Sequence, residues 1–262
     1  MPVVYVSHGS PMVAVERDGY TEALRRMGET LTAPTAVVVI SAHWESAAPV
    51  RVGSSERPSL IYDFGGFPPE LYHLKYPAPG SPGIAKDIVQ RLVAAGIPAV
   101  EDSQRGLDHG AWVPLRQIYP DAKVPVVEVT LPMPRTPAQL LAIGKALAPL
   151  RDQGVLIVGS GGIVHNLRRV VFADKNAPVE PWAKSFDDWV RARLEDKDVA
   201  ALVDYRKRAP EAAASVPTTE HFDPLFVALG ASGEEFEVKD VFEGFHHGNL
   251  SMRTVIISAS QK

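Results

Sequence analysis

The chain has 262 residues, of which 45% are hydrophobic and 22% are charged, and its formal net charge is −4 at pH 7. This composition is typical of a globular protein that buries its own core, and the absence of cysteine excludes disulfides, zinc–thiolate sites, iron–sulfur clusters and cysteine nucleophiles. Because the longest basic run, residues 205–208, is short and no apolar run is long enough to span a bilayer, we expect a cytoplasmic protein without nucleic-acid or membrane partners.

Two hydrophobic runs near the start of the chain each lead directly to a histidine. Residues 3–6 precede His8, and residues 36–40 precede His43. Such runs of β-branched residues are typical of strands that are buried on both faces of a parallel sheet. A histidine just beyond such a strand lies where open α/β sheets bind their ligands, in the crevice at the carboxyl ends. The two runs therefore predict two neighbouring imidazoles, which make half of a metal site.

Between these runs, apolar residues recur at helical spacing from Tyr20 to Leu31. We expect a helix there, which forms a right-handed βαβ unit with the two strands. Residues 51–82 lack periodicity but are rich in proline, glycine and aromatic residues, which predicts a long ordered loop that forms a wall of the binding pocket. A second aromatic, glycine-punctuated stretch covers residues 106–115, and its His109 is expected to lie in a loop.

The remaining segments continue the alternation of strands and helices. The expected helices cover residues 84–93, 140–150, 181–194 and 222–229, and the expected strands cover residues 124–131, 155–158, 236–241 and 253–258. Gly230 is expected just beyond the end of the last helix. The sequence thus predicts one α/β domain over residues 1–262, with a central, mostly parallel or mixed sheet flanked by helices and a metal site at the carboxyl ends of the strands.

Four of the eight histidines have positions that favour a metal site. His8, His43 and His165 all follow predicted buried strands, so their side chains are expected to converge at one edge of one sheet. His221 stands at the start of a predicted helix, where the local positive field favours the neutral imidazole that a metal requires.

The other histidines have weaker placements. His109 lies between Asp108 and a glycine and is a candidate for contact with the substrate or with a ligand residue. His73, His246 and His247 follow no predicted strand and are expected to be surface or packing residues.

The carboxylates that accompany the histidines leave the ligand set open. Two histidines and one carboxylate suit Fe(II) and oxygen activation, whereas three histidines and a water suit Zn(II) hydrolysis as well as iron or copper chemistry. Glu45, Asp108 and Glu220 each lie close to a candidate histidine in the sequence. Glu45 is better placed to share a metal with His43 than Asp108 and Glu220 are with the histidines that directly follow them, because residues two apart on a strand share a face.

The glycine-rich run at residues 159–162 could also indicate a nucleotide-binding loop or the nucleophile of a serine hydrolase, but its spacing disfavours both. It lacks the lysine of a P-loop and the G-x-G-x-x-G pattern of a dinucleotide site, and Ser160 does not stand in a G-x-S-x-G elbow. We expect these glycines to allow close approach of a ligand or of a neighbouring strand.

Seven short motifs occur in order along nearly the whole chain. They are His8-Gly9-Ser10-Pro11, Ser41-Ala42-His43-Trp44, residues 62–68, residues 76–80, residues 106–112, residues 159–166 and Thr219-Glu220-His221-Phe222. Together they resemble the DODA-type (4,5-DOPA extradiol) family of class III ring-cleaving dioxygenases, which is related to the catalytic subunit of protocatechuate 4,5-dioxygenase.

The resemblance implies a non-haem metal centre with His8 and His43 as ligands and His221 as the third, where the distant protocatechuate relatives have a glutamate. It implies that His165 is the acid–base histidine, which also approaches the metal in the absence of substrate, and that His109 faces the substrate. The implied activity is Fe(II)-dependent opening of the ring of a catechol, DOPA-like or a related aromatic diol, by O2. Because the ligands would all be neutral imidazoles, we expect the isolated protein to hold Zn(II) readily.

The chemistry explains why these residue types are needed. An imidazole titrates near neutrality, so His165 can take a proton from the catechol and later return it, while His109 hydrogen-bonds a ring hydroxyl or the oxygen. Four aromatic side chains are expected to form a flat slot for the substrate ring: Trp44, Tyr62, Phe64 and Trp112.

Two other functions fit the same residues. A zinc hydrolase would use the same ligands and would turn over esters or amides without O2. A binding or signalling protein on the same scaffold, as in the Memo-type relatives, would not need His165 for its role.

Overall fold

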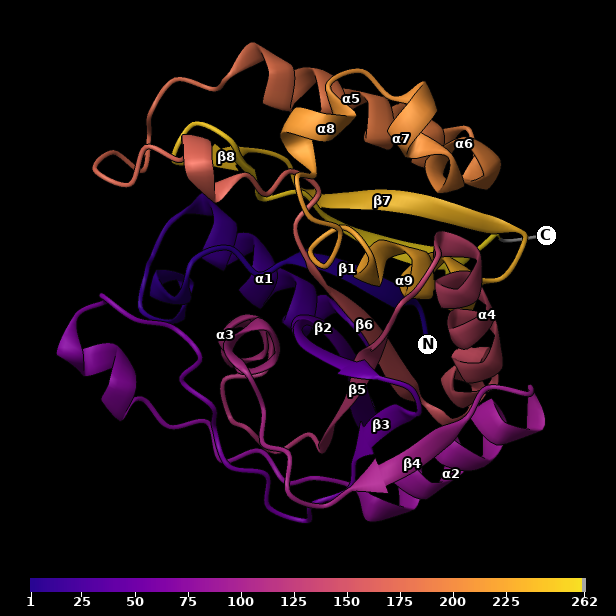
Figure 1. The fold of residues 1–262 in the computed structure, drawn as a ribbon. Coiled ribbons are helices and arrows are strands. Elements are labelled where there is room, and N and C mark those ends of the chain that lie inside the picture. Colours follow the sequence, from indigo (N-terminus) through magenta and orange to yellow (C-terminus); the bar gives the residue numbers. More distant parts are fainter. Residues whose placement is uncertain (261–262) are drawn as a thin grey trace.

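An eight-stranded mixed sheet forms the centre of the computed structural model, which describes residues 1–260 (Figure 1). The order of the strands across the sheet is β4-β3-β5-β2-β6-β1-β10-β7. Their bounds are β1 (Val3–Ser7), β2 (Ala36–Ala47), β3 (Val50–Gly53), β4 (Ala99–Asp102), β5 (Val126–Met133), β6 (Val155–Gly161), β7 (Phe236–Phe242) and β10 (Thr254–Ala259). A separate two-stranded ribbon consists of β8 (Phe245–His246) and β9 (Leu250–Ser251).

The four central strands β5, β2, β6 and β1 are parallel to one another. On one side β10 runs antiparallel to β1, and on the other side β3 runs antiparallel to β5. Strand β6 lies between β1 and β2, although it comes much later in the chain. This arrangement confirms the predicted mixed α/β sheet, and it places the carboxyl ends of β2, β6 and β1 next to one another.

Helices cover both faces of the sheet. Helices α1 and α3 pack on one face, whereas α2, α4 and α9 pack on the other, and α5 to α8 extend the second layer near β7 (Figure 1). The bounds are α1 (Gly19–Thr30), α2 (Pro82–Ala94), α3 (His109–Ile118), α4 (Pro137–Leu147), α5 (Pro181–Glu195), α6 (Val199–Val203), α7 (Tyr205–Arg208), α8 (Ala212–Ser215) and α9 (Pro224–Ser232).

The central strands are apolar throughout because both of their faces are buried. In β1, Val3 and Tyr5 belong to the core beneath α4 and α9, whereas Val4 and Val6 belong to the core beneath α1 and α3. Each such side chain stabilises the fold by about 1.5–3 kcal/mol when it is fully buried. Two opposed cores therefore hold the parallel strands rigidly, and with them the residues at their carboxyl ends.

The structure corrects the prediction for residues 106–115, because His109 begins a helix instead of lying in a loop. Asp108 is the N-cap of α3, and its side chain accepts a hydrogen bond from the backbone N–H of Ala111. Two features hid this helix in the sequence. Gly110 and Pro114 have low helix propensity, and nearly every residue of α3 is buried, so no polar stripe marks it.

Two further predictions differ from the structure. The short strands β3 and β4 were not predicted, and β3 occupies the start of the segment that was expected to be a loop over residues 51–82. Gly230 lies inside α9 and not beyond its end. A Cβ at Gly230 would stand 2.1 Å from the carbonyl oxygen of Leu141, so this glycine permits the close packing of α9 on α4.

Among the described residues, none of the helices combines the length and the apolar character needed to cross a membrane.

Candidate metal centre

Three candidate histidines come from three strands that are neighbours in the sheet. His8 directly follows β1, His43 lies near the carboxyl end of β2, and His165 lies in the loop that follows β6. Because these strands are parallel and adjacent, the three side chains reach the same edge of the sheet. The convergence expected from the sequence is found.

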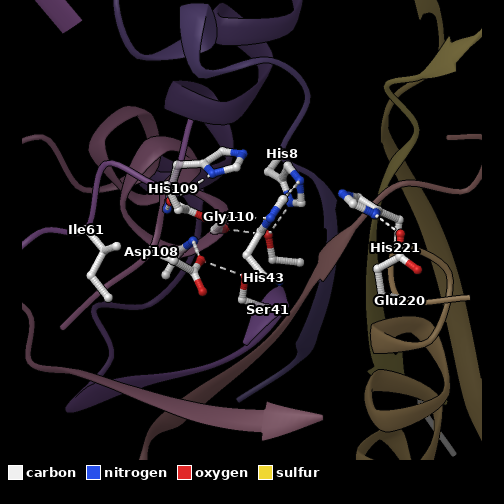
Figure 2. A network of polar contacts seen from close by, with 12 residues as sticks. His8, Ser41, His43, Ile61, Asp108, His109, Gly110, Glu220 and His221 are labelled. Atoms are coloured by element: carbon white, nitrogen blue, oxygen red, sulfur yellow. Dashed lines mark hydrogen bonds and ion pairs between the residues drawn. The ribbon is translucent and has the colours of Figure 1, made fainter. Parts of the chain in front are cut away.

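Two more imidazoles complete the cluster, as Figure 2 shows. The ring centroid of His43 lies 4.9 Å from that of His8, 4.0 Å from that of His109 and 4.9 Å from that of His221. The rings of His165 and His221 stack at 3.4 Å with an angle of 8° between their planes. In Figure 2, His221 points from the opposite wall toward His8 and His43.

The potential ligand atoms fall into two groups on opposite walls of this cluster. One group contains His8, His43 and His109. The other contains His165, Glu220 and His221. Within each group the ligand atoms lie within 4.8 Å of one another.

His8 has a defined tautomer. Its Nδ1 lies 3.0 Å from the Oγ of Ser160, and this Oγ lies 2.5 Å from the carbonyl oxygen of Gly110. The single hydroxyl proton of Ser160 is donated to the carbonyl, so the Oγ accepts from Nδ1–H of His8. The lone pair of His8 therefore stands on Nε2, which faces the cluster.

The position of His221 depends on the glycines at the end of β6 and directly after it. The backbone N–H of Gly162 donates to the carbonyl oxygen of His221 at 2.8 Å, and a Cβ at Gly161 would stand 2.0 Å from that oxygen. The predicted close approach at these glycines is confirmed, but the approaching segment is the turn that carries His221 and the start of α9, and not a ligand or a neighbouring strand. The Nδ1 of His221 lies 3.1 Å from Oε1 of Glu220, a carboxylate that can only accept, so the lone pair stands on Nε2.

A carboxylate that the sequence reasoning missed stands between His43 and His109. Oδ1 of Asp63 accepts a hydrogen bond from the backbone N–H of His109 at 2.9 Å and lies 3.0 Å from its Nδ1. Oδ2 of Asp63 lies 3.5 Å from Nδ1 of His43. Burial raises the pKa of Asp63, but the hydrogen bonds from His109 outweigh it and lower this pKa to about 2. Asp63 is thus ionised, holds the backbone of His109 and lies beside both rings.

A second polar network fixes the segment that carries His109. Oδ1 of Asp108 accepts from the Oγ of Ser41 at 2.7 Å (Figure 2). Oδ2 of Asp108 accepts from Arg105 at 2.8 Å. Glu128 accepts from the backbone N–H of Asp108, and burial together with the neighbouring Asp108 raises the pKa of Glu128 well above its ordinary value. This network joins the start of α3 to the strands beneath the cluster.

Burial disfavours the charged form of four imidazoles of the cluster. It lowers the pKa of His43 and of His165 to about 4, and it lowers the pKa of His8 and of His221 well below the ordinary value for histidine. The neighbouring imidazoles lower the pKa of each of the four further. At neutral pH these side chains therefore carry the free lone pairs that metal binding needs.

The donor set fits a transition-metal ion. The Nε2 atoms of His8 and His43 are 3.1 Å apart, and two lone pairs at this distance repel unless a proton or a cation lies between them. Two nitrogens that bind one ion at about 2.0–2.1 Å are separated by about 3 Å. The Nε2 of His221 is buried and has no hydrogen-bond partner among the described residues. Such an atom is unfavourable unless something coordinates it.

A cavity of about 740 Å³ opens above the cluster. It is lined by His8, Gly9, Ser10, Pro11, Met12, His43, Asp63, Phe64, Gly65, Gly66, Phe67, His109, His165, Leu167, Phe172, Glu220, His221, His247 and Leu250. The prediction that the long loop before α2 forms a wall of the pocket is confirmed by Asp63, Phe64 and Phe67.

The expected aromatic slot is only partly correct. Phe64 lines the cavity, but Trp44, Tyr62 and Trp112 do not. Trp112 is fully buried in the core, and Trp44 is buried beneath the guanidinium of Arg105. Trp44 in β2 and Trp112 in α3 are therefore packing residues and not part of the cavity wall.

The remaining predictions have mixed outcomes. His247 was expected to be a surface or packing residue, but it lines the cavity. His246 is buried and His73 is exposed, as expected. Glu45, which the sequence favoured as the carboxylate of the site, instead pairs with Arg135 at 2.6 Å. Glu220 lies beside the potential ligand atoms of His165 and His221.

Comparisons with known proteins agree with this geometry. The catalytic LigB subunit of aromatic ring-opening dioxygenase is the family that matches residues 1–254. A 4,5-DOPA dioxygenase extradiol from Escherichia coli K12 is 41% identical over 261 residues, which covers 98% of this chain and 94% of the relative. The enzyme of the same name from Beta vulgaris is 39% identical over 251 residues, with 94% and 92% covered.

A solved structure is similar in fold. The crystal structure of an uncharacterized protein from Escherichia coli K12 matches with a TM-score of 0.83 and 37% sequence identity, over 98% of this chain and 99% of that one.

Proposed function

The chain belongs to the family of the catalytic LigB subunit of aromatic ring-opening dioxygenases, and from this premise we propose that His8, His43 and His221 hold its metal ion. As a member of this family, the protein is an extradiol dioxygenase that opens the ring of a catechol with O2 and uses a non-haem metal. The observation that supports the assignment of ligands is that Nε2 of His43 lies 3.1 Å from Nε2 of His8, while the unpartnered, buried Nε2 of His221 belongs to a ring that points toward them from the opposite wall.

The active metal in this proposal is Fe(II). When bound, the ion brings the two diol oxygens and O2 together and conducts electron density between them. The three imidazoles are neutral ligands, which also suit Zn(II), so the isolated protein is expected to contain zinc and to be inactive in that form.

His165 acts as the acid and base in this proposal. Its pKa of about 4 makes the imidazole neutral at pH 7, so it can accept a proton from a diol hydroxyl and return it when the ring opens. The stacking on His221 holds the ring of His165 beside the ligands.

His109 orients the substrate. Its Nδ1 faces Asp63, which leaves Nε2 as the atom that can hydrogen-bond a ring hydroxyl. Phe64 packs edge-on against His109, with 5.7 Å between the ring centroids, and offers the flat side of the slot. By analogy with the names of the relatives, the substrate is a DOPA-like catechol.

Reconstitution of the metal-free protein tests this proposal. The protein is loaded with Fe(II) or Zn(II) without oxygen, and oxygen uptake and visible absorbance are then followed with DOPA, with other catechols and with tyrosine as a control that lacks the second hydroxyl. We expect uptake and a yellow ring-opened product only with Fe(II) and a catechol. His165→Ala is expected to retain the metal and lose ring opening, whereas His8→Ala is expected to lose the metal.

Two results would contradict the proposal. Absence of oxygen uptake with every catechol would exclude the assigned activity. Turnover of esters or amides by the zinc form, independent of O2, would favour a zinc hydrolase.

A further inference from the structure

A buried arginine that does not line the cavity makes two ion pairs next to the site. Arg135 follows β5 and directly precedes Thr136, the N-cap of α4, and 7% of its side chain is exposed. Its Nη1 lies 2.6 Å from Oε1 of Glu45, and its Nε lies 2.5 Å from Oδ2 of Asp223. One planar guanidinium therefore holds two carboxylates that belong to distant parts of the chain.

Glu45 stands where β2 resumes its pairing with β5 after the segment that carries His43. Ile40 is the last residue of β2 that is paired before the register shifts, and Glu45 is the first one after the shift. His43 lies within the shifted segment, two residues before Glu45. A contact that fixes Glu45 therefore fixes the end of the segment that carries this candidate ligand.

Asp223 has the corresponding position on the opposite wall. It stands two residues after His221 and is the N-cap of α9. Its backbone N–H donates to the carbonyl oxygen of Thr219 at 2.9 Å, which closes the turn that carries His221. Only 4% of the side chain of Asp223 is exposed. A contact that fixes Asp223 therefore fixes this turn.

Arg135 thus connects the two walls of the metal site. His43 belongs to the group of ligand atoms on the sheet, and His221 belongs to the group on the segment before α9. The centroids of these two rings are 4.9 Å apart. Zn–N distances of about 2.0–2.1 Å leave little tolerance for a change in this separation if both rings are to bind one ion.

A guanidinium suits this task because its donors have a fixed arrangement. Burial lowers the pKa of Arg135, but the two carboxylates outweigh it and raise this pKa above its ordinary value, so the side chain stays charged. Nη1 also donates to the carbonyl oxygen of Pro132 at 3.4 Å, which ties the fork to β5. A lysine ammonium on its flexible stem would keep the charge but would not fix the relative position of two carboxylates.

We propose that Arg135 is a positioning residue that sets the separation of His43 and His221 and thereby the affinity of the site for its metal ion. This inference rests on the proposed function, in which both histidines bind the same ion. Residues that orient metal ligands typically change metal affinity about 10–100-fold when they are replaced.

Competition with a chelator tests this role through the dissociation constant for Zn(II), without reference to turnover. We expect Arg135→Lys, which keeps the charge and removes the fork, to weaken Zn(II) binding about 10-fold or more. Glu45→Ala removes the partner whose side chain is 34% exposed and is expected to weaken binding in the same direction. Because both substitutions break one link, the double variant should bind no more weakly than Arg135→Lys alone.

Arg253→Lys is the matched control. Arg253 is fully buried and binds Asp187 of α5 at 2.6 Å and Asp240 of β7 at 2.8 Å. Its side chain therefore also bridges two carboxylates, but these flank none of the proposed ligands. Since Arg253 is more deeply buried than Arg135, its replacement should disturb the fold at least as much, and we expect it to leave the affinity for Zn(II) unchanged.

A spectroscopic measurement separates positioning from a general loss of stability. The visible absorption of bound Co(II) depends on the geometry of its ligands. At saturating Co(II), Arg135→Lys is expected to show altered bands, whereas Arg253→Lys is expected to keep the spectrum of wild type. Circular dichroism checks that each variant is folded.

His221→Ala distinguishes failure of this inference from failure of the proposed function. If wild type does not bind Zn(II), or if His221→Ala binds it as tightly as wild type, the proposed ligand set is wrong and the inference is wrong with it. If His221→Ala loses affinity but Arg135→Lys keeps it, only the inference is wrong.

Two further outcomes would overturn the inference. An equal loss of affinity in Arg253→Lys and Arg135→Lys would show that the effect reflects general destabilisation. If Arg135→Lys does not fold, Glu45→Ala decides, and wild-type affinity in that variant would exclude the role of the bridge.

Discussion

Ser160 fixes the tautomer of His8 through a hydroxyl that serves two partners. It donates to the carbonyl oxygen of Gly110 and accepts from Nδ1 of His8. The two contacts direct the lone pair of His8 toward the other imidazoles. A residue in β6 thereby prepares a candidate ligand that follows β1.

Replacement of this hydroxyl should weaken metal binding. In Ser160→Ala, Nδ1 of His8 loses its acceptor, so both tautomers and other ring orientations become accessible. We expect the dissociation constant for Zn(II) to rise about 10–100-fold, measured by competition with a chelator. Ser232→Ala is a suitable control because Ser232 is also buried and donates to a backbone carbonyl, at Leu229, away from the site. Equal affinities of the two variants would contradict this account of Ser160.

A methyl group at position 110 should disturb the same site sterically. A Cβ on Gly110 would stand 2.4 Å from the Oγ of Ser41 and 3.1 Å from Cδ2 of His43. Ser41 cannot move freely because it donates to Asp108. We expect Gly110→Ala to destabilise the protein by about 1–3 kcal/mol in urea unfolding and to weaken Zn(II) binding.

The control for this substitution is another glycine near the start of a helix. Gly83 lies in the first turn of α2, and a Cβ there meets nothing within 4 Å. Gly83→Ala should leave Zn(II) affinity unchanged and stabilise the fold by up to about 1 kcal/mol. If Gly110→Ala behaves like Gly83→Ala, the close contact with His43 has no functional consequence.

The predictable parts of the fold are those that local pattern specifies. Strands β1, β2 and β6 consist of long β-branched runs, and α1 has a regular apolar stripe, so periodicity alone identifies them. Strands β3 and β4 have four residues each, which is too short for a periodic signal. Helix α3 is buried nearly all round, so it lacks the amphipathic pattern that reveals a surface helix.

The residues of the candidate site likewise include some that local sequence predicts and some that it does not. His8 and His43 could be predicted because each follows closely on a run of β-branched residues, although β2 continues past His43 to Ala47. Ser160 and Asp63 could not, because the contact of Ser160 with His8 joins residues 152 apart and that of Asp63 with His109 joins residues 46 apart. Such partners depend on the order of strands in the sheet and on the path of a long loop, and neither follows from local sequence.

Removal of the metal should lower the stability of the whole fold. The proposed ligands lie just after β1, in β2 and in the segment before α9, so an ion bound by them links the sheet to that segment. An ion that binds only the folded state at about 100 times its dissociation constant stabilises it by about 2.7 kcal/mol. We expect a chelator to lower Tm and Zn(II) or Fe(II) to restore it, measured by calorimetry. Mg²⁺, which prefers oxygen ligands, should not restore it.

A histidine outside the site should make stability depend on pH. His246 is buried beside the ring of Tyr20, and its Nε2 lies 3.7 Å from Oδ2 of Asp18. Burial is the main cause that lowers its pKa to about 4, and Lys175 and His247 lower it further, whereas Asp18 raises it. In the unfolded chain the pKa of histidine is about 6.5.

The sign of the effect follows from these two values. Between pH 6.5 and pH 4 the unfolded chain binds a proton at His246 and the folded protein does not, so acidification through this window favours unfolding. The contribution of His246 is therefore fully present above pH 6.5 and is lost as the pH falls toward 4. Solvent screening reduces it to about 1–2 kcal/mol.

Urea unfolding of wild type and His246→Gln at pH 7.5 and pH 5.0 measures this contribution. The glutamine does not titrate, so the free energy of unfolding should fall less between the two pH values in the variant than in wild type, by about 1 kcal/mol or more. His73→Gln is the control for the substitution itself, because His73 is exposed. Since the buried imidazoles of the metal site titrate in the same window, all proteins are compared in the metal-free form. An identical pH dependence in His246→Gln and wild type would show that His246 takes up its proton equally well in the folded protein.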